Sequence, residues 1–449
     1  MFKTLINSFK NKDVRKKILI TLALVFLFRL GTWIPIPGLN ENIFRTDWIG
    51  DNNMLFGLMS AITGGALAQG AILAVGVAPY INASIIMQLL TVAIPPLEQL
   101  SKQGEEGRKK ITKITHILTL ILAAAQGIGI VLTMRNAGGL NAELLSADNA
   151  LGWNHTLSQW LIGSAVVIIL MAGASFTMWI GERITEKGVS NGISILIFVG
   201  IIASIGQALI VTVSRIATTG GQEANNALIE LIGFLVMVVL VFALIVFIDL
   251  GERRVPIQYA KQVKGRKMYG GQSTHIPIKI NPSGVLPIIF AMALITFPQL
   301  VAQLFFPPDN AFLLFYNRYL GVGRWPYFLV SGILIFFFSY FYAGIQFNPE
   351  EVSRNIQQYG GFIPGIRPGK PTGEYLGRIS KRLTLFGAAF LTFIVIVPGV
   401  IFGLVLTESP MLVTAFSATG LLIVVSVALE FDKSLESQLM MKQYKGFLK

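Results

Sequence analysis

The sequence predicts an all-α polytopic membrane protein with ten transmembrane helices, and three observations support this fold class. Of the 449 residues, 53% are hydrophobic and only 13% are charged, about half the charged fraction of an average soluble domain. Apolar stretches of roughly 20 residues, the length that crosses a bilayer core, recur along the whole chain. Lys and Arg residues gather in alternate connections between these stretches. The expected spans are 18–36, 71–94, 114–134, 157–180, 192–213, 227–249, 284–306, 326–347, 383–407 and 411–430.

The distribution of positive charge determines the expected orientation. With the N-terminus in the cytosol, 30 of the 36 Lys and Arg residues fall in cytosolic segments, five fall in external loops, and Arg29 lies within the first span. This excess places both termini on the cytosolic side. The basic start followed by an apolar run also resembles a secretory signal peptide. That run is too long for a signal peptide and nine more spans follow it, so we expect an uncleaved first span.

Residues 54–69 interrupt the simple pattern of spans. They are apolar but short, and Gly64 and Gly65 break them. A segment of about ten apolar residues cannot cross a bilayer, so this one predicts a half-helix that enters the membrane and turns back. Such backbone is tolerated only inside protein or beside a water-filled cavity. The alternative is an interfacial helix that lies on the outer surface.

Prolines occur in the second and the seventh spans, at Pro79, Pro287 and Pro298, and proline can kink a helix. These spans occupy the second position in each of two five-span halves, residues 1–213 and 214–449. Two halves of five spans would have opposite orientations in the membrane, as inverted repeats do. The symmetry is a hypothesis based on the pattern of spans rather than on repeated sequence.

Two cytosolic connections, residues 250–283 and 348–382, are long and basic. Connections of more than about 15 residues are usually functional or disordered, so we predict a docking face for a partner. The alternative is that their charges only enforce the topology. Gly365 to Lys370 superficially resembles a phosphate-binding loop, but Pro371 replaces the required Ser or Thr and no strand is expected before it. Nucleotide binding is therefore not expected.

The sequence lacks the residues of most catalytic centres. It contains no cysteine, which excludes disulfides, thiolate zinc sites and cysteine nucleophiles. Its three histidines, His116, His155 and His275, form no pair with metal-binding spacing. Arg29 is the main charge within a span; it is either functional or extends to the interface. We expect no enzyme, no metal and no cofactor.

The apolar centre predicts a pathway that is gated by hydrophobic residues. A secondary transporter with inverted repeats is the alternative, and it would need carboxylates at the membrane midplane. A structural or assembly subunit without a conduit is a third possibility.

Seven segments along the chain carry a resemblance to a known family. They occur in the family's order, cover nearly the whole chain and are highly specific as a set. The chain resembles the SecY family, the channel subunits of the bacterial Sec protein translocase (the SecYEG translocon). The segments are WIPIPG (33–38), GGALAQGAILAVGVAPYINASIIMQLL (64–90), EGRKKITK (106–113), GERITEKGVSNGISILIF (181–198), GQSTHIPIKINPSGVLPIIFA (271–291), FNPEEVSRNI (347–356) and GGFIPGIRPGKPT (360–372).

The resemblance implies two pseudo-symmetric five-helix halves around a central pore, with a plug half-helix in residues 54–69. The implied plug residues are Met59, Ser60, Ile62, Gly64 and Gly65. The implied apolar pore ring consists of Val77, Ile81, Ile193, Ile197, Ile289 and Ile423. The implied lateral gate lies between the second and third spans and the seventh and eighth, with the gate residues Asn82, Gln88, Asn281 and Phe297. The implied docking residues are Arg253, Arg254 and Arg367.

The resemblance also implies the activity. The chain would be a protein-conducting channel that passes unfolded polypeptides across the cytoplasmic (inner) cell membrane and releases hydrophobic segments sideways into it. Since the sequence shows no ATP site, a partner must supply the driving force. The implied partners are the SecE and SecG subunits, the SecA motor ATPase, the ribosome, signal peptides, unfolded polypeptide substrates and membrane lipids.

Overall fold

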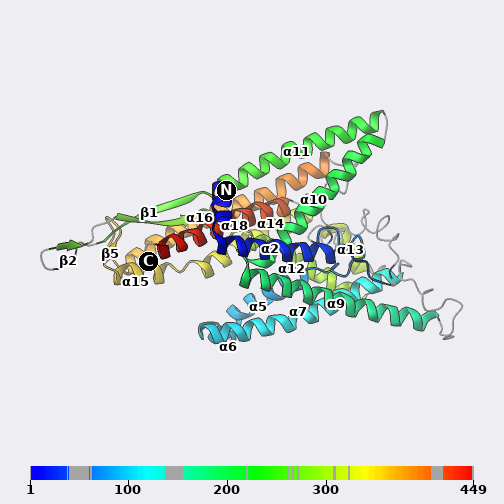
Figure 1. Ribbon diagram of the computed structural model, residues 1–449, viewed down its shortest axis with the longest axis horizontal. Helices are drawn as coiled ribbons and strands as arrows, with labels where there is room; N and C mark the ends of the chain where they lie inside the picture. Colours follow the sequence, from blue (N-terminus) through cyan, green and yellow to red (C-terminus); the bar gives the residue numbers. More distant parts are fainter. Residues whose placement is uncertain are drawn as a thin grey trace.

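The fold is a bundle of long helices that run roughly along the long axis of the molecule (Figure 1). The computed structural model describes residues 2–37, 39, 60, 63–136, 155–218, 221–259, 262–264, 267–269, 273–306, 310–321, 324–405 and 418–446. Each of the ten expected spans overlaps one helix. These helices are α2 (Lys12–Gly31), α5 (Ala78–Ala93), α7 (Glu105–Asn136), α9 (His155–Lys187), α10 (Gly192–Thr218), α11 (Gln222–Asp249), α12 (Leu286–Phe305), α14 (Trp325–Gln346), α16 (Lys370–Val405) and α18 (Ala418–Gly446).

The all-α membrane fold class is confirmed. Among the described residues, six helices are long and apolar enough to cross a membrane on their own. They are α7, α9, α10, α11, α14 and α16. A seventh span arises if α5 and the following α6 (Pro95–Lys102), which are bent by 101° at their junction, count as one. Helices α2, α12 and α18 complete a set of ten that is consistent with the expected number.

The expected second span, 71–94, is wrong in its first part. Only Ala78–Ala93 is helical, and residues 64–70 and 72–77 form successive turns. Four glycines in this stretch have positive φ, namely Gly64, Gly65, Gly70 and Gly76. This backbone conformation is excluded from an α-helix and is favoured by glycine alone. Mean hydropathy is not sensitive to backbone conformation. By hydropathy alone, these apolar turns therefore look the same as a membrane span.

The expected proline kinks need a similar correction. Pro79 and Pro287 lie in the first turn of α5 and α12 rather than within them, where the missing N–H costs no hydrogen bond. Pro298 does lie inside α12. The two helix starts share the sequence Gly-Val-x-Pro, residues 76–79 and 284–287. The two glycines have φ of 56° and 60°, and the valines that follow have φ of −88° in both cases. We call these two matching turns the elbows of α5 and α12.

The two expected halves, residues 1–213 and 214–449, contact each other along two seams. On one side α7 packs against α12, and on the other α10 packs against α11 and α18. Within the first half the chain of contacts runs from α5 to α7, α9 and α10, and within the second from α12 to α14, α16 and α18. Two large hydrophobic clusters draw residues from both sides of this division, whereas a third, from Ile36 to Leu170, lies wholly in the first part.

Both long basic connections contribute strands to one sheet, which the sequence did not predict. Strand β1 (Glu252–Tyr259) pairs antiparallel with β4 (Ser273–Lys279) and with β5 (Gly361–Phe362). A hairpin of β2 (Gln262–Lys264) and β3 (Lys267–Tyr269) projects from the far end (Figure 1). Helix α15 (Pro349–Gln358) starts at Asn348, whose side chain accepts from the amides of Glu350 and Glu351. It packs with the first turns of α16 under the sheet.

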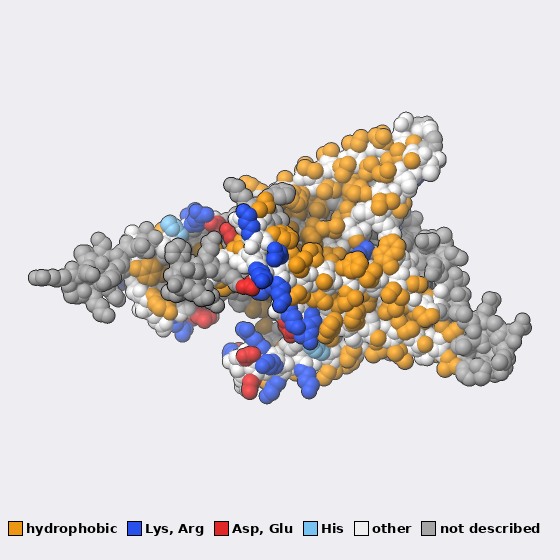
Figure 2. Space-filling model, viewed as in Figure 1, with side chains coloured by type: hydrophobic (Ala, Val, Ile, Leu, Met, Phe, Trp, Pro, Cys, Tyr) orange, Lys and Arg blue, Asp and Glu red, His pale blue; other side chains and the backbone are white. Residues whose placement is uncertain are grey.

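Charged and apolar surfaces are separated along the long axis. Figure 2 shows most Lys and Arg gathered toward the end that carries the sheet, α6 and the start of α2, while hydrophobic side chains are frequent and charged ones rare on the visible face of the helical region. Exposed apolar side chains on α11 include Leu228, Ile229, Ile232, Val236 and Val239. Such a surface suits contact with lipid rather than water. Two further short helices, α1 (Phe2–Lys10) and α13 (Ala311–Leu320), lie beside the long ones.

Candidate functional site

The six expected ring residues lie in one hydrophobic cluster where the two halves meet. Val77, Ile197 and Ile423 are nearly inaccessible, and Ile81, Ile193 and Ile289 are partly buried against them. They come from the elbow and first turn of α5, the start of α10, the start of α12 and the first turns of α18. We call these six side chains the central cluster. Their chain positions span nearly the whole sequence, yet the fold brings all six together.

The chemistry of the central cluster is that of a dry barrier. All six side chains are β-branched and aliphatic, which restricts their first torsion. They offer no donor or acceptor to water or to ions, so a narrow passage lined by them disfavours wetting. Within the described residues, no group of three or more His, Asp or Glu side chains could hold a metal ion. The side chains of the central cluster are therefore suited to seal a passage rather than to catalyse a reaction or to coordinate an ion.

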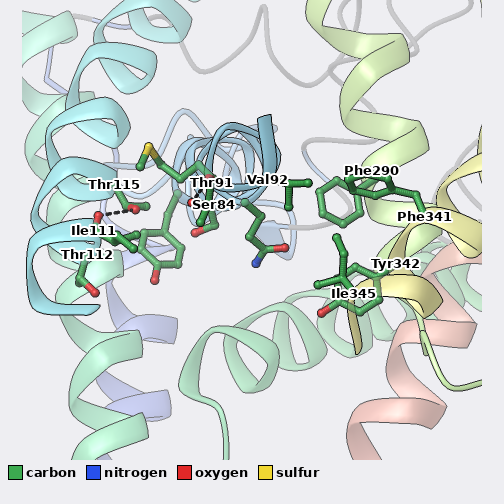
Figure 3. A pocket seen from close by; sticks show the side chains of 13 residues that line it. Ser84, Thr91, Val92, Ile111, Thr112, Thr115, Phe290, Phe341, Tyr342 and Ile345 are labelled. Atoms are coloured by element: carbon green, nitrogen blue, oxygen red, sulfur yellow. Dashed lines mark hydrogen bonds between the residues drawn. The ribbon is translucent and has the colours of Figure 1, made fainter. Parts of the chain in front are cut away.

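A pocket of about 360 Å³ opens between α5 and α7 on one side and α12 and α14 on the other. Its walls differ in chemistry (Figure 3). Helices α5 and α7 contribute hydroxyl groups, from Tyr80, Ser84, Thr91, Thr112 and Thr115. Helices α12 and α14 contribute Phe290, Phe341, Tyr342 and Ile345, and the Phe290 and Tyr342 ring centroids lie 6.1 Å apart. We call this the interhelix pocket.

The expected gate residues are distributed around the interhelix pocket rather than gathered in it. Gln88 lines it. Asn82 is half-buried on α5 and Phe297 is 40% exposed on α12; neither lines the pocket. Asn281 is buried and bonds within its own turn, where Nδ2 donates to the Gly284 carbonyl and Oδ1 accepts from Ser283. It thus supports the elbow of α12. The aromatic wall of the pocket was missed by the sequence analysis.

The glycine turn within the expected plug segment is held by Arg29. The Arg29 Nη1 atom donates to the Gly64 carbonyl at 3.3 Å, and Gly64 and Gly65 have φ of 71° and 87°. A carbonyl in a membrane interior needs such a partner. Ser60 is buried, and its carbonyl accepts from the Gly65 amide at 2.8 Å. The predicted plug residues Met59 and Ile62 lie outside the described residues.

The three expected docking arginines are exposed on the unit formed by both basic connections. Arg253 and Arg254 lie on β1, where Arg254 Nε is 2.7 Å from Glu252 Oε1. Arg367 follows β5 in a turn whose backbone is tied down, because Thr372 Oγ1 donates to the Arg367 carbonyl at 2.8 Å. The guanidinium groups of Arg253 and Arg367 have no ion-pair partner among the described residues. They are available to carboxylates or phosphates of another molecule.

This arrangement coincides with a known family. The sequence profile of SecY matches residues 71–431, which include the central cluster, the interhelix pocket and the sheet. The chain belongs to the SecY family.

Curated SecY relatives match over their full length. The protein translocase subunit SecY of Streptomyces galbus is 42% identical over 447 residues, covering 98% of both chains. That of Halalkalibacterium halodurans is 39% identical over 456 residues and covers the whole of both. Residues outside the SecY profile, including the first helices, therefore also have counterparts in these relatives.

Solved structures show the same fold. A structure described as that of a protein conducting channel has a TM-score of 0.60 at 18% identity and covers 94% of this chain and 92% of its own. The Sec61 channel from a canine ribosome-channel complex has a TM-score of 0.57 at 16% identity, with the same coverage. The SecY fold expected from the sequence motifs is thus confirmed.

Proposed function

We propose that this chain is the channel-forming subunit of a protein translocase, through which unfolded polypeptides cross the membrane. The observation that carries the proposal is the central cluster, six aliphatic side chains from four helices that meet between two halves of the molecule. A cluster of this kind can exclude water and ions when closed. It can also yield to varied side chains, because dispersion contacts are weak one by one and non-directional.

The interhelix pocket gives such a channel a sideways exit. It lies between α5 and α7 of one half and α12 and α14 of the other, beside the seam between α7 and α12. Parting of that seam would connect the centre with the surrounding lipid. A segment of about 20 apolar residues gains free energy by leaving for lipid, so the pocket is the natural site for signal peptides and for membrane segments on their way out.

The finer assignments follow from charge and surface. With the Lys- and Arg-rich end in the cytosol, both termini are cytosolic and the chain is a multi-pass protein of the cytoplasmic membrane. The halves 1–213 and 214–449 part at the α7–α12 seam, and the matching elbows of α5 and α12 support their pseudo-symmetry. SecA or the ribosome docks on the sheet and on Arg253, Arg254 and Arg367. SecE and SecG are the accompanying subunits, and Gly64 and Gly65 form the base of the plug.

A transport assay with a reversible block tests this function. The native chain lacks cysteine, so Thr112→Cys on α7 and Ile345→Cys on α14, which both line the interhelix pocket, can be bridged by a bifunctional thiol reagent with a cleavable disulfide. In vesicles that contain the complete complex and its motor, bridging should stop uptake of an unfolded precursor into a protease-protected space, and reduction should restore it. Each single-cysteine variant treated alike is the control. Unaltered uptake after complete bridging would contradict the gate, and no uptake in any state would contradict the proposed function.

A further inference from the structure

Helix α12 carries a defect in its hydrogen-bond ladder. Pro298 has no N–H, so the Leu294 carbonyl loses its partner one turn earlier, and the proline ring crowds that carbonyl. Breaks of this kind are repaired in membrane helices by side chains of neighbouring elements. The Ile295 carbonyl lies in the same disturbed turn. Ile295 is buried, whereas Leu294 is 48% exposed.

A tyrosine from another helix bonds the disturbed turn at the Ile295 carbonyl. The Tyr316 hydroxyl, on α13, donates to the Ile295 carbonyl. Tyr316 is 6% exposed, and burial raises the pKa of its hydroxyl to about 12. The group therefore remains protonated, and a donor, at every physiological pH. The contact joins residues 21 positions apart in the sequence.

Helix α13 bridges two helices of the second half. It packs against both α12 and α14 and lies beside α12 in Figure 1. Asn310 caps its start, with Oδ1 accepting from the Phe312 amide at 2.9 Å. Tyr327, buried near the start of α14, lies close enough to Tyr316 for an electrostatic interaction. Tyr316 thus sits where α12, α13 and α14 come together.

We propose that Tyr316 is a positioning residue, which holds α12 in its present conformation by bonding the Ile295 carbonyl in the turn that Pro298 disrupts. Through this bond α13 links α12 to α14, so that the two helices move as one body. We call the link from α14 through Tyr316 of α13 to Ile295 of α12 the strap. That α12 is a gate helix rests on the proposed function; that Tyr316 stabilises its outer half does not.

Hydrogen exchange on the full-length complex in lipid nanodiscs tests the strap directly. Tyr316→Phe keeps the ring and removes only the donor. Loss of one such bond should speed exchange in residues 294–305 by about fivefold and leave α5 unchanged. Tyr319→Phe is the matched control, because Tyr319 lies on the same helix, is 45% exposed and has its ring centroid 4.8 Å from that of Phe315. Exchange in Tyr316→Phe equal to that of the parent would overturn the proposal.

A second substitution tests whether the Tyr316 bond depends on Pro298. Pro298→Ala restores the N–H that bonds the Leu294 carbonyl and removes the ring that crowds this turn. The turn should then depend less on the Tyr316 bond, and Tyr316→Phe should have at most half its effect on exchange. An equal effect in both backgrounds would show that the Tyr316 bond acts independently of Pro298, and its role in the proline turn would be refuted. Precursor uptake measured on the same preparations keeps the two claims apart. If exchange responds as predicted while no variant transports polypeptide, the proposed function fails and the strap stands.

Discussion

His116 Nε2 and Glu182 Oε1 lie 2.5 Å apart and join α7 to α9. His116 adjoins Thr115, which lines the interhelix pocket, so the pair braces one wall of the pocket against the helix behind it. The two side chains are 31% and 32% exposed, and water therefore screens part of their attraction. The sequence showed only that His116 has no metal-spaced partner, and its contact with Glu182 was not predicted.

The His116–Glu182 pair should behave as a coupled unit. Glu182→Gln and His116→Ala should each lower the thermal stability of the purified complex, and the double variant should be little worse than either single one. A double-mutant cycle should give a coupling free energy of about 1 kcal/mol. His275→Ala, at an exposed position on β4, is the control and should have no effect. Strict additivity of the two substitutions would show that the contact contributes nothing.

The two elbows should differ in their tolerance of a methyl group. Alanine at either glycine meets an unfavourable positive φ, which costs about 1 kcal/mol. At Gly76 the new Cβ would also lie 2.7 Å from Thr63 Cγ2, whereas at Gly284 nothing lies within 4 Å. Thermal stability of the complex should therefore fall more for Gly76→Ala than for Gly284→Ala. Gly206→Ala, inside α10 with open space around it, should be neutral or slightly stabilising. The reverse order of Gly76→Ala and Gly284→Ala would contradict the geometry of the elbows.

The docking role of Arg367 predicts a loss of transport without a loss of folding. Arg367→Glu should leave the amount of membrane-inserted protein unchanged and reduce precursor uptake at least tenfold, because a carboxylate repels the acidic or phosphate groups that a guanidinium binds. Arg354→Glu is the control on the same sheet-and-helix unit; its exposed pair with Glu350 spans 3.6 Å and should contribute little. Normal uptake by Arg367→Glu would remove Arg367 from the docking surface.

The orientation can be read by labelling from outside. Cysteine at Thr218, at the exposed end of α10, should react with an impermeant thiol reagent in intact cells. Cysteine at Thr274, exposed on β4, should react only after the cells are opened. The opposite pattern would invert the topology that the charge distribution predicts.

Hydropathy and charge predicted the helical scaffold, because crossing a bilayer requires apolar length and little else. The membership of the central cluster came from the resemblance to the SecY family, and its gathering from distant positions became visible only in the fold. The turns around Gly70 and Gly76 escaped prediction, because positive φ leaves no trace in hydropathy. The pairing of β1 with β5 escaped as well, since these strands lie about 100 residues apart in the sequence.

The sequence does contain patterns that indicate two other structural features, the elbows and the proline turn of α12. The repeated Gly-Val-x-Pro at residues 76–79 and 284–287 marks both elbows and supports the symmetry of the halves. Pro298 within an apolar helix predicts that some neighbour must repair the ladder, although the sequence does not say that Tyr316 does so. The aromatic wall of Phe290, Phe341 and Tyr342 follows only from the packing of α12 on α14.

The most direct test of the central cluster as the seal is the planar-bilayer conductance of the resting complex. The test variant changes Ile81, Ile193 and Ile289 together to Gly. This change removes the branched side chains that exclude water, and the resting complex should then conduct ions continuously. The control variant changes Ile210, Ile229 and Ile333 together to Gly. These residues are each more than 60% exposed on α10, α11 and α14. The control carries the same helix penalty, and its resting complex should stay closed to ions. A central-cluster variant as tight as the parent would contradict the account, and the barrier to ions would have to lie elsewhere.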